Sequence, residues 1–194
     1  MAEFNNICVY CSSSNAVDKS YYNSTEELGS FIGTTGKTLV YGGAKIGLMG
    51  ALADSVKNNS GKIIGVIPEY LNDAGISYKN CDELIITKDL RERKKIMESL
   101  ADAFIVLPGG YGTLEEFVEI LTLKQLKTHN KPIIIINTNN FYGKLFDFFD
   151  HLYSQNFTHS DYRGLYFTAG DIKKAWDYLE NYVPLKLKDK WFVS

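Results

Sequence analysis

Short apolar runs rich in β-branched residues alternate with helical patterns along almost the whole chain, and this alternation restricts the fold more than any other feature. It is typical of a parallel sheet whose strands are joined by right-handed helical crossovers. We therefore predict a Rossmann-like α/β fold, a three-layer sandwich with a mainly parallel sheet of about seven strands and helices on both faces. The predicted strands cover residues 7–11, 38–41, 62–67, 83–87, 103–107, 132–136 and 165–168. The predicted helices cover residues 21–35, 48–59, 90–100, 113–127, 141–153 and 171–182.

The length and composition fit one globular domain, because 194 residues of which 45% are hydrophobic can bury a sizeable core. We expect residues 1–183 to form a single Rossmann-like domain and residues 184–194 to form a C-terminal tail or arm. Such a tail is disordered by default, although Trp191 and Phe192 favour docking. A formal net charge of -2 argues against nucleic acid as a partner. With no signal-peptide pattern and no apolar run of membrane-spanning length, we expect a cytoplasmic protein without a membrane partner.

A glycine-rich run, PGGYGTLEE at residues 108–116, lies between a predicted strand and a predicted helix. In parallel α/β sheets, ligands bind at the carboxyl ends of the strands. Glycines let the backbone approach a ligand closely and allow positive φ, while the free N–H groups of a helix N-terminus favour an anion. The run therefore predicts a phosphate cradle with a carboxylate, Glu116, beside it.

Glu116 also has a structural interpretation. The spacing Thr113-x-x-Glu116 matches a capping box, in which the glutamate accepts a hydrogen bond from the N-cap amide. Both interpretations predict an ionised Glu116, because amide donors and the helix dipole favour the charged form. Glu115 lies about 100° further round the helix, so we expect it to have a different role.

A second glycine cluster, residues 41–50, follows the second predicted strand. Gly42 and Gly43 stand at the end of that strand, where we expect the backbone to approach a ligand. Gly47 and Gly50 fit either a ligand site or the close packing of a helix on the sheet. The spacing departs from G-x-G-x-x-G because Ala44 occupies the place of the second glycine, so a dinucleotide site is not indicated.

Several other motifs are excluded by their context. The run from Gly36 to Thr38 precedes a strand and has Phe31 where a P-loop needs glycine, so Gly36 is better interpreted as a helix C-cap. Cys8 and Cys11 form a C-x-x-C inside a predicted strand, which sends them to opposite faces and argues against a redox or zinc pair. The three histidines lack metal-site spacing, and G-x-S-x-G is absent. We expect no metal and no cofactor.

Basic residues stand at the start of the helix predicted over 90–100, where acidic residues are usually preferred. The i,i+4 pairs Asp89–Arg93 and Lys94–Glu98 would explain them as a solvated face. Alternatively, an arginine fork here serves an anionic phosphate or a nucleobase, because this helix precedes the strand that carries the glycine run. The charge pattern by itself leaves both alternatives open.

Together these motifs resemble the Lonely Guy family, the cytokinin-activating nucleoside 5'-monophosphate phosphoribohydrolases. The match to the family pattern P-G-G-x-G-T-x-x-E is complete, and the likeness runs from about residue 7 to residue 182. Supporting motifs are YGG at 41–43, GLMG at 47–50 and Arg93-Lys94. Such proteins were once labelled possible lysine decarboxylases, but we identify no pyridoxal phosphate lysine site. The chain departs from the family in two places, with Ser12 where a glycine is usual and Arg91 where histidine is common.

The resemblance implies a homodimeric hydrolase that cleaves the N-glycosidic bond of AMP or an N6-substituted AMP, giving a free base and ribose 5-phosphate. It implies that Arg93 and Glu116 are catalytic. The residues it implies for substrate binding are Ser13, Gly42, Gly43, Lys94, Gly109, Gly110, Tyr111, Gly112, Thr113, Leu114, Glu115 and Thr122. An ionised Glu116 suits the positive charge that builds on the ribose, and Arg93 suits the departing base. The alternative is a non-catalytic nucleotide-binding or carrier module on the same fold.

Overall fold

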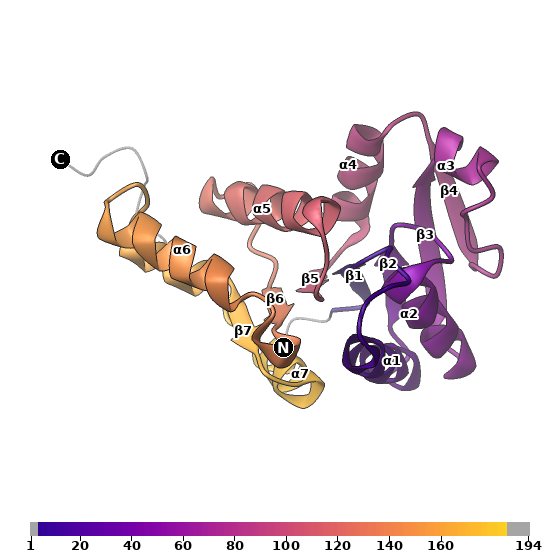
Figure 1. Ribbon diagram of the computed structural model, residues 1–194, viewed down its shortest axis with the longest axis horizontal. Coiled ribbons are helices and arrows are strands. Elements are labelled where there is room, and N and C mark those ends of the chain that lie inside the picture. The colour runs from indigo at the N-terminus through magenta and orange to yellow at the C-terminus, as the bar shows by residue number, and fades with distance from the viewer. Residues whose placement is uncertain (1–3, 186–194) are drawn as a thin grey trace.

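A single parallel sheet of seven strands, in the order β4-β3-β2-β1-β5-β6-β7, organises the computed structural model, which describes residues 4–185 (Figure 1). All six neighbouring pairs are parallel, so the predicted mainly parallel sheet is confirmed. The strands are β1 (Asn6–Tyr10), β2 (Thr38–Tyr41), β3 (Lys62–Pro68), β4 (Glu83–Thr87), β5 (Ala103–Val106), β6 (Ile133–Ile136) and β7 (Phe167–Ala169). Strands buried on both faces need continuous apolar runs, and the four isoleucines of β6, all buried, are the plainest case.

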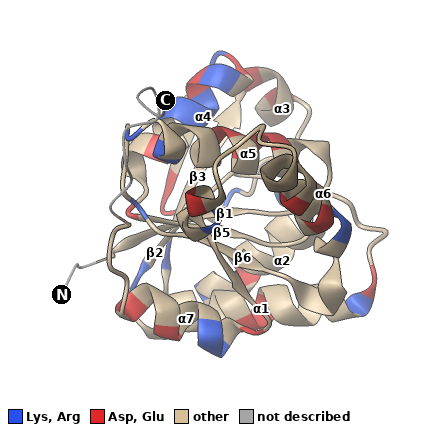
Figure 2. Ribbon diagram, turned by 90° about the vertical axis from the view of Figure 1, so that its left-hand side faces the viewer, with Lys and Arg blue, Asp and Glu red and all other residues tan. Residues whose placement is uncertain are grey.

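Helices cover both faces of the sheet, which confirms the predicted three layers (Figures 1 and 2). One face carries α1 (Lys19–Thr34), α2 (Gly47–Asn58) and α7 (Ile172–Glu180). The other carries α4 (Leu90–Leu100), α5 (Tyr111–Gln125) and α6 (Gly143–Ser154). The short helix α3 (Glu69–Asp73) and the 3₁₀ turns η1 (Thr138–Asn140) and η2 (Ser160–Leu165) were not predicted, because each is too short to show a periodic pattern.

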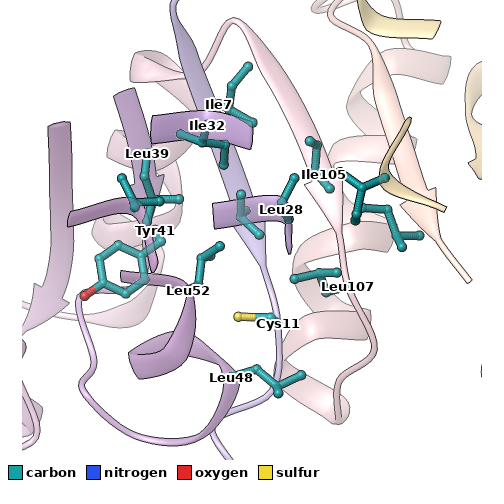
Figure 3. Close-up of a cluster of buried hydrophobic side chains, with 14 of the residues drawn as sticks. Ile7, Cys11, Leu28, Ile32, Leu39, Tyr41, Leu48, Leu52, Ile105 and Leu107 are labelled. Carbon is teal, nitrogen blue, oxygen red and sulfur yellow. The ribbon is translucent and has the colours of Figure 1, made fainter. Parts of the chain in front are cut away.

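Two apolar cores, one on each face, hold the layers together. The first packs strand residues such as Ile7, Leu39 and Ile105 against Leu28 of α1 and Leu52 of α2 (Figure 3). The second lies beneath α4, α5 and α6. This division separates the two cysteines of the C-x-x-C.

Cys8 belongs to the second core and Cys11 to the first, so the prediction that they occupy opposite faces is confirmed. Burial raises the pKa of the Cys8 thiol to about 12 and the pKa of Cys11 still further. Gly36 follows the C-terminus of α1 with φ +69°, and its amide donates to the Gly33 carbonyl at 3.1 Å, as the predicted C-cap requires. None of the described helices is long and apolar enough to cross a membrane. Trp191 and Phe192, expected to favour docking of the tail, lie outside the described residues.

The strand order places a switch point beside β1. The chain runs outward from β1 through β2 and β3 to β4, then returns to the other side of β1 with β5. The loops after β1 and β5 therefore lead to helices on opposite faces and leave a crevice between them. Both glycine-rich runs reach the same edge of the sheet as this crevice, because they follow β2 and β5.

Lys124, in the last turn of α5, is buried in an unusual way. Its side chain is only 3% exposed, and its Nζ has no hydrogen-bond partner in the described part of the chain. The Nζ lies 5.1 Å from the centroid of the Tyr182 ring, a cation–π contact. Burial lowers the pKa of Lys124 to about 8, because the charged ammonium is poorly solvated there.

We expect Lys124→Met to stabilise the fold at pH 7 by about 1–2 kcal/mol, because the thioether needs no solvation and can keep the contact with Tyr182. The folded-state pKa near 8 lies below the ordinary value of 10.5, so the unfolded chain binds more protons between these values. Wild-type stability should thus rise with pH above about 8, and the Met variant should lack this rise. Urea unfolding at pH 7 and pH 9.5 measures both effects, with the exposed Lys144→Met as the control. A lower unfolding free energy for Lys124→Met at pH 7 would contradict this account.

Candidate active site

Three loops at the carboxyl ends of β1, β2 and β5 enclose a cleft of about 490 Å³. Its walls are completed by the start of α2, Arg93 of α4, the first two turns of α5 and residues on either side of the turn after α3. This is the edge of the sheet at which the switch point predicts a ligand. The cleft is lined by Cys11, Ser12, Ser13, Ser14, Gly42, Ala44, Ile46, Met49, Leu71, Ile76, Arg93, Gly110, Tyr111, Gly112, Thr113 and Glu116.

The N-terminus of α5 opens into this cleft. Gly110 is the N-cap and has no side chain to satisfy the first amides, and the first intrahelical bond to it runs from the Leu114 amide at 3.0 Å. The N–H groups of the first turn, at residues 111–113, therefore lack intrahelical acceptors and form the positive end of the helix dipole. A Cβ added to Gly110 or Gly112 would meet nothing within 4 Å, so these glycines leave room for a ligand. The structure thus places the open N-terminus of a helix where the glycine run predicts an anion cradle.

Three details of the predicted cradle differ in the structure. None of its three glycines has positive φ, so their freedom of approach comes from the missing side chains. Gly109 is needed for packing, because a Cβ there would overlap the side chain of Thr113. The helix also begins at Tyr111, two residues before the predicted start, so Thr113 lies inside its first turn.

Arg93 and Glu116 form an ion pair at the inner end of the cleft. Arg93 Nη1 donates to Glu116 Oε1 at 2.8 Å, and their side chains are 13% and 8% exposed. Arg93 Nε donates to the Val66 carbonyl of β3 at 3.0 Å, which fixes the plane of the guanidinium. Glu116 lies in the second turn of α5, where it pairs with Arg93 and does not cap the helix. The capping-box interpretation was therefore wrong.

The charge of Glu116 is set by this pair. Burial raises the pKa of the Glu116 carboxyl above its ordinary value, while the Arg93 guanidinium opposes that rise. Protonating Glu116 would leave a buried guanidinium without a counter-ion, which favours the carboxylate. The expected ionised form thus rests on Arg93, and the amide donors invoked from the capping pattern are not its cause.

Gly42 makes room for the guanidinium. A Cβ at this position would overlap Arg93 and would lie 2.5 Å from Cε of Met49. Gly42 does line the cleft, as expected, but the Arg93 guanidinium occupies the space where its side chain would lie. Gly43, with φ +70°, packs against Ile67 of β3 and lies outside the cleft lining, so the structure does not bring it to the site.

The two further glycines of this cluster serve packing. A Cβ at Gly47 would overlap the backbone of Ser13, and a Cβ at Gly50 would overlap the backbone of Lys45. Of the two interpretations left open for them, close packing is therefore the one that the structure supports. The Gly47 amide also donates to Asn15 Oδ1 at 2.7 Å, which ties α2 to the loop after β1.

The basic residues of α4 pair with α5 across the helix interface. Lys94 Nζ forms ion pairs with Glu115 and, at 2.8 Å, with Glu119, while Arg93 contacts Glu116. Asp89 accepts a hydrogen bond from the Glu92 amide at 2.8 Å and so caps α4. The intrahelical pairing considered from the sequence is thus not the arrangement of these side chains. In the ribbon, the basic residues of α4, in blue, lie near acidic residues of α5, in red (Figure 2).

The remaining predicted residues divide between the cleft and its surroundings. Ser13 and Tyr111 line the cleft, and Tyr111 is 93% exposed. Lys94, Leu114, Glu115 and Thr122 lie outside its lining. Leu114 packs on the core beneath α5, and the exposed Thr122 donates its hydroxyl proton to the Val118 carbonyl at 2.8 Å.

Sequence reasoning missed most of the apolar wall. Ile46, Met49, Leu71 and Ile76 line the cleft, and the last two flank the turn after α3, which no pattern predicted. The position of Ile46 and Met49 within the second glycine cluster was the available signal. Cys11 also lines the cleft, but burial raises the pKa of its thiol so far that a thiolate nucleophile is not expected.

The fold and cleft define a class: Rossmann-like α/β proteins that present a helix N-terminus and a paired carboxylate at the switch point of a parallel sheet. Comparison with known proteins narrows the class to a family. Residues 49–179 match the family described as "Possible lysine decarboxylase". The chain is 39% identical over 183 residues to the cytokinin riboside 5'-monophosphate phosphoribohydrolase LOG of Oryza sativa subsp. japonica, covering 94% of this chain and 76% of that protein.

The phosphoribohydrolase LOG1 of Arabidopsis thaliana is also 39% identical over 183 residues, covering 94% of this chain and 86% of that protein. The chain therefore belongs to the Lonely Guy family of cytokinin riboside 5'-monophosphate phosphoribohydrolases, and the resemblance inferred from its motifs is confirmed.

Solved structures share the fold at lower identity. The molybdenum cofactor binding protein of Rippkaea orientalis has a TM-score of 0.72 and 20% identity, covering 93% of this chain and 98% of that chain. The molybdenum cofactor carrier protein of Chlamydomonas reinhardtii has a TM-score of 0.70 and 23% identity, covering 92% and 98%. At such identities the likeness supports the Rossmann-like architecture and carries no argument about the ligand.

Proposed function

We propose that the protein hydrolyses the N-glycosidic bond of a nucleoside 5'-monophosphate, AMP or an N6-substituted AMP such as a cytokinin riboside monophosphate, to the free base and ribose 5-phosphate. The observation that carries the proposal is the buried Arg93–Glu116 pair in the same cleft as the open N-terminus of α5. An anion site and a carboxylate one helical turn apart, about 5.4 Å along the axis, suit the 5'-phosphate and the anomeric carbon of one nucleotide.

The phosphate binds the first-turn amides of α5, between Gly110 and Thr113. Because the phosphate takes no part in bond cleavage, its binding energy serves to position the sugar against Glu116. Breaking the glycosidic bond builds positive charge on the ribose, which the Glu116 carboxylate stabilises while it orients or deprotonates the attacking water. The hydroxyl of water adds to the anomeric carbon as the bond to the base nitrogen breaks. The proton lost by water passes through Glu116 to solvent, and the base nitrogen takes up a proton from solvent, so the products are ribose 5-phosphate and the neutral base.

Arg93 assists the departing base. Its guanidinium acts as a hydrogen-bond donor to the developing negative charge, not as a proton source. The apolar wall of Met49, Leu71 and Ile76 offers the base a surface on which its faces are desolvated. A decarboxylase with a lysine-bound pyridoxal cofactor would need a lysine in the cleft, and no described lysine lines it.

In this proposal residues 1–183 act as one nucleotide-binding domain, followed by the tail, in a cytoplasmic homodimer. Support for a second subunit comes from an exposed stripe along α5 and its C-cap, formed by Tyr111, Val118, Thr122 and Leu126. These residues recur at helical spacing, so they share one face. Thr122 lies on this stripe and outside the cleft, so the substrate contact that the resemblance implies for it requires a second subunit.

We expect purified protein incubated with AMP or isopentenyl-AMP to release the base and ribose 5-phosphate in equal amounts. Adenosine should react with a kcat/KM at least about 10²-fold lower, because it forgoes the binding energy of the phosphate. Chromatographic quantification of both products over time measures this, with GMP and CMP as tests of base preference. Tight AMP binding without product would contradict hydrolysis of AMP and favour a nucleotide-binding module.

A further inference from the structure

Ser12 is a buried hydroxyl beside the anion cradle. It follows β1 by two positions and is only 9% exposed. It lines the cleft and also a second cavity of about 230 Å³. Gly110, the N-cap of α5, lines both cavities as well, so Ser12 stands where the two cavities meet at the helix N-terminus.

Two hydrogen bonds fix Ser12 and leave its hydroxyl proton unused. The Ser12 amide donates to the Pro108 carbonyl at 3.3 Å, which joins the loop after β1 to the glycine run. The Ser14 amide donates to Ser12 Oγ at 3.1 Å, so one lone pair of the hydroxyl is occupied. Among residues 4–185, nothing is found to accept the hydroxyl proton of Ser12. A buried donor without an acceptor is unfavourable until a ligand or water fills the place.

The chemistry of the surroundings identifies the acceptor. The second cavity is walled chiefly by apolar groups and contributes almost no hydrogen-bonding surface. Its lining residues besides Ser12 are Val17, Tyr21, Leu48, Pro108, Gly109, Gly110 and Phe141. An anion at the α5 N-terminus therefore binds in the cleft and not in the second cavity. Ser12 lines the cleft at this point. A phosphate monoester has three terminal oxygens, more acceptor sites than the first-turn amides fill, and hydrogen bonds to charged acceptors are the stronger kind.

We propose that the Ser12 hydroxyl donates to the 5'-phosphate of the substrate and strengthens the preference of this chain for phosphorylated over unphosphorylated nucleosides. The inference rests on the proposed function, since it assigns a further donor to that site. The family resemblance implies a glycine at this position, which would offer no such donor. Ser12 thus gives this chain a phosphate contact beyond the shared backbone cradle.

The test compares wild type with Ser12→Ala and Ser12→Gly in calorimetric titrations with ribose 5-phosphate. Both variants should bind about tenfold or more weakly, because each lacks one hydrogen bond to a charged group. In AMP turnover the KM should rise by a similar factor while kcat changes by less than about twofold, since the bond exists in the ground and transition states alike. Adenosine, which has no phosphate, should react with Ser12→Ala as it does with wild type.

Asn15→Ala is the matched control, because it loosens the same loop at Gly47 but leaves the Ser12 hydroxyl in place. It should keep the wild-type affinity for ribose 5-phosphate. An equal loss of affinity in Asn15→Ala, or unchanged affinity in both Ser12 variants, would overturn the inference. The titration with ribose 5-phosphate measures binding without turnover, so it tests Ser12 whether or not AMP is hydrolysed. Wild type that binds AMP but forms no product would contradict the proposed function and leave this test valid.

Discussion

Glu116→Gln should reduce kcat for AMP hydrolysis by at least about 10³-fold while AMP still binds. The amide keeps the shape of the carboxylate but carries no charge to stabilise the ribosyl cation and no basicity to activate water. Phosphate binding depends on the first turn of α5, which the substitution leaves intact. Rapid-quench product assays at saturating AMP, together with AMP titrations, separate the two effects.

Glu119→Gln is the matched control for this prediction. Glu119 lies on the same helix, is 44% exposed, and pairs with Lys94 outside the cleft. The same change of charge there should leave kcat within about twofold of wild type, since exposed ion pairs contribute little. If kcat for AMP hydrolysis is similar in Glu116→Gln and wild type, Glu116 is not a catalytic residue and serves only as the ion-pair partner of Arg93.

The Glu116 substitution also affects stability, and the assay has to allow for this. It leaves the Arg93 guanidinium, 13% exposed, without its counter-ion, which can destabilise a fold by up to about 3–5 kcal/mol. Thermal unfolding fixes a temperature at which the variant is fully folded, and the rates are compared there. The pH profile gives a second readout: burial raises the pKa of Glu116, so wild-type kcat should fall in acid at a pH above the ordinary value of 4.5, as the base takes up its proton.

The regular part of the fold follows from local patterns that the tertiary structure does not override. The bounds predicted for 38–41, 83–87 and 90–100 are those of β2, β4 and α4, because a clear change of pattern marks both ends of each. The start of α5 was placed too late because Gly112 is a poor helix former. In the structure the helix nevertheless runs through it, since residues from Phe117 onward pack on the core and hold the helix as a whole.

The site could be predicted only as far as its residues were tied to a motif. The glycine run predicted an open helix N-terminus at the sheet edge, and the family resemblance singled out Arg93 and Glu116, but nothing local showed that these two side chains meet. They are 23 residues apart and come together because β5 lies between their helices in the chain. The role of Gly42 could not be inferred either. A glycine in the sequence shows only that no side chain is present, and the tertiary structure is needed to show which neighbour fills the space.

Gly42→Ala should lower kcat/KM for AMP by about 10²-fold without contacting the substrate, because the added methyl displaces the Arg93 guanidinium. Arg93 would lose its alignment with Glu116 and with the Val66 carbonyl. Gly170→Ala is the control, since a Cβ there meets nothing within 4 Å and the residue lies outside the cleft lining. Its kcat/KM should match wild type.

A double-mutant cycle with Arg93→Lys decides whether the effect of Gly42 passes through Arg93. Lysine lacks the planar fork that reaches Gly42, so Arg93→Lys alone should already lose most of the activity. Adding Gly42→Ala to it should then lower kcat/KM by less than about threefold, a strongly non-additive result. If Gly42→Ala costs the same factor in both backgrounds, the methyl acts on the substrate or on the backbone of β2, and Gly42 is not a positioning residue for Arg93. Because both outcomes are measured as ratios of kcat/KM between folded variants, a general loss of stability cannot imitate the coupling.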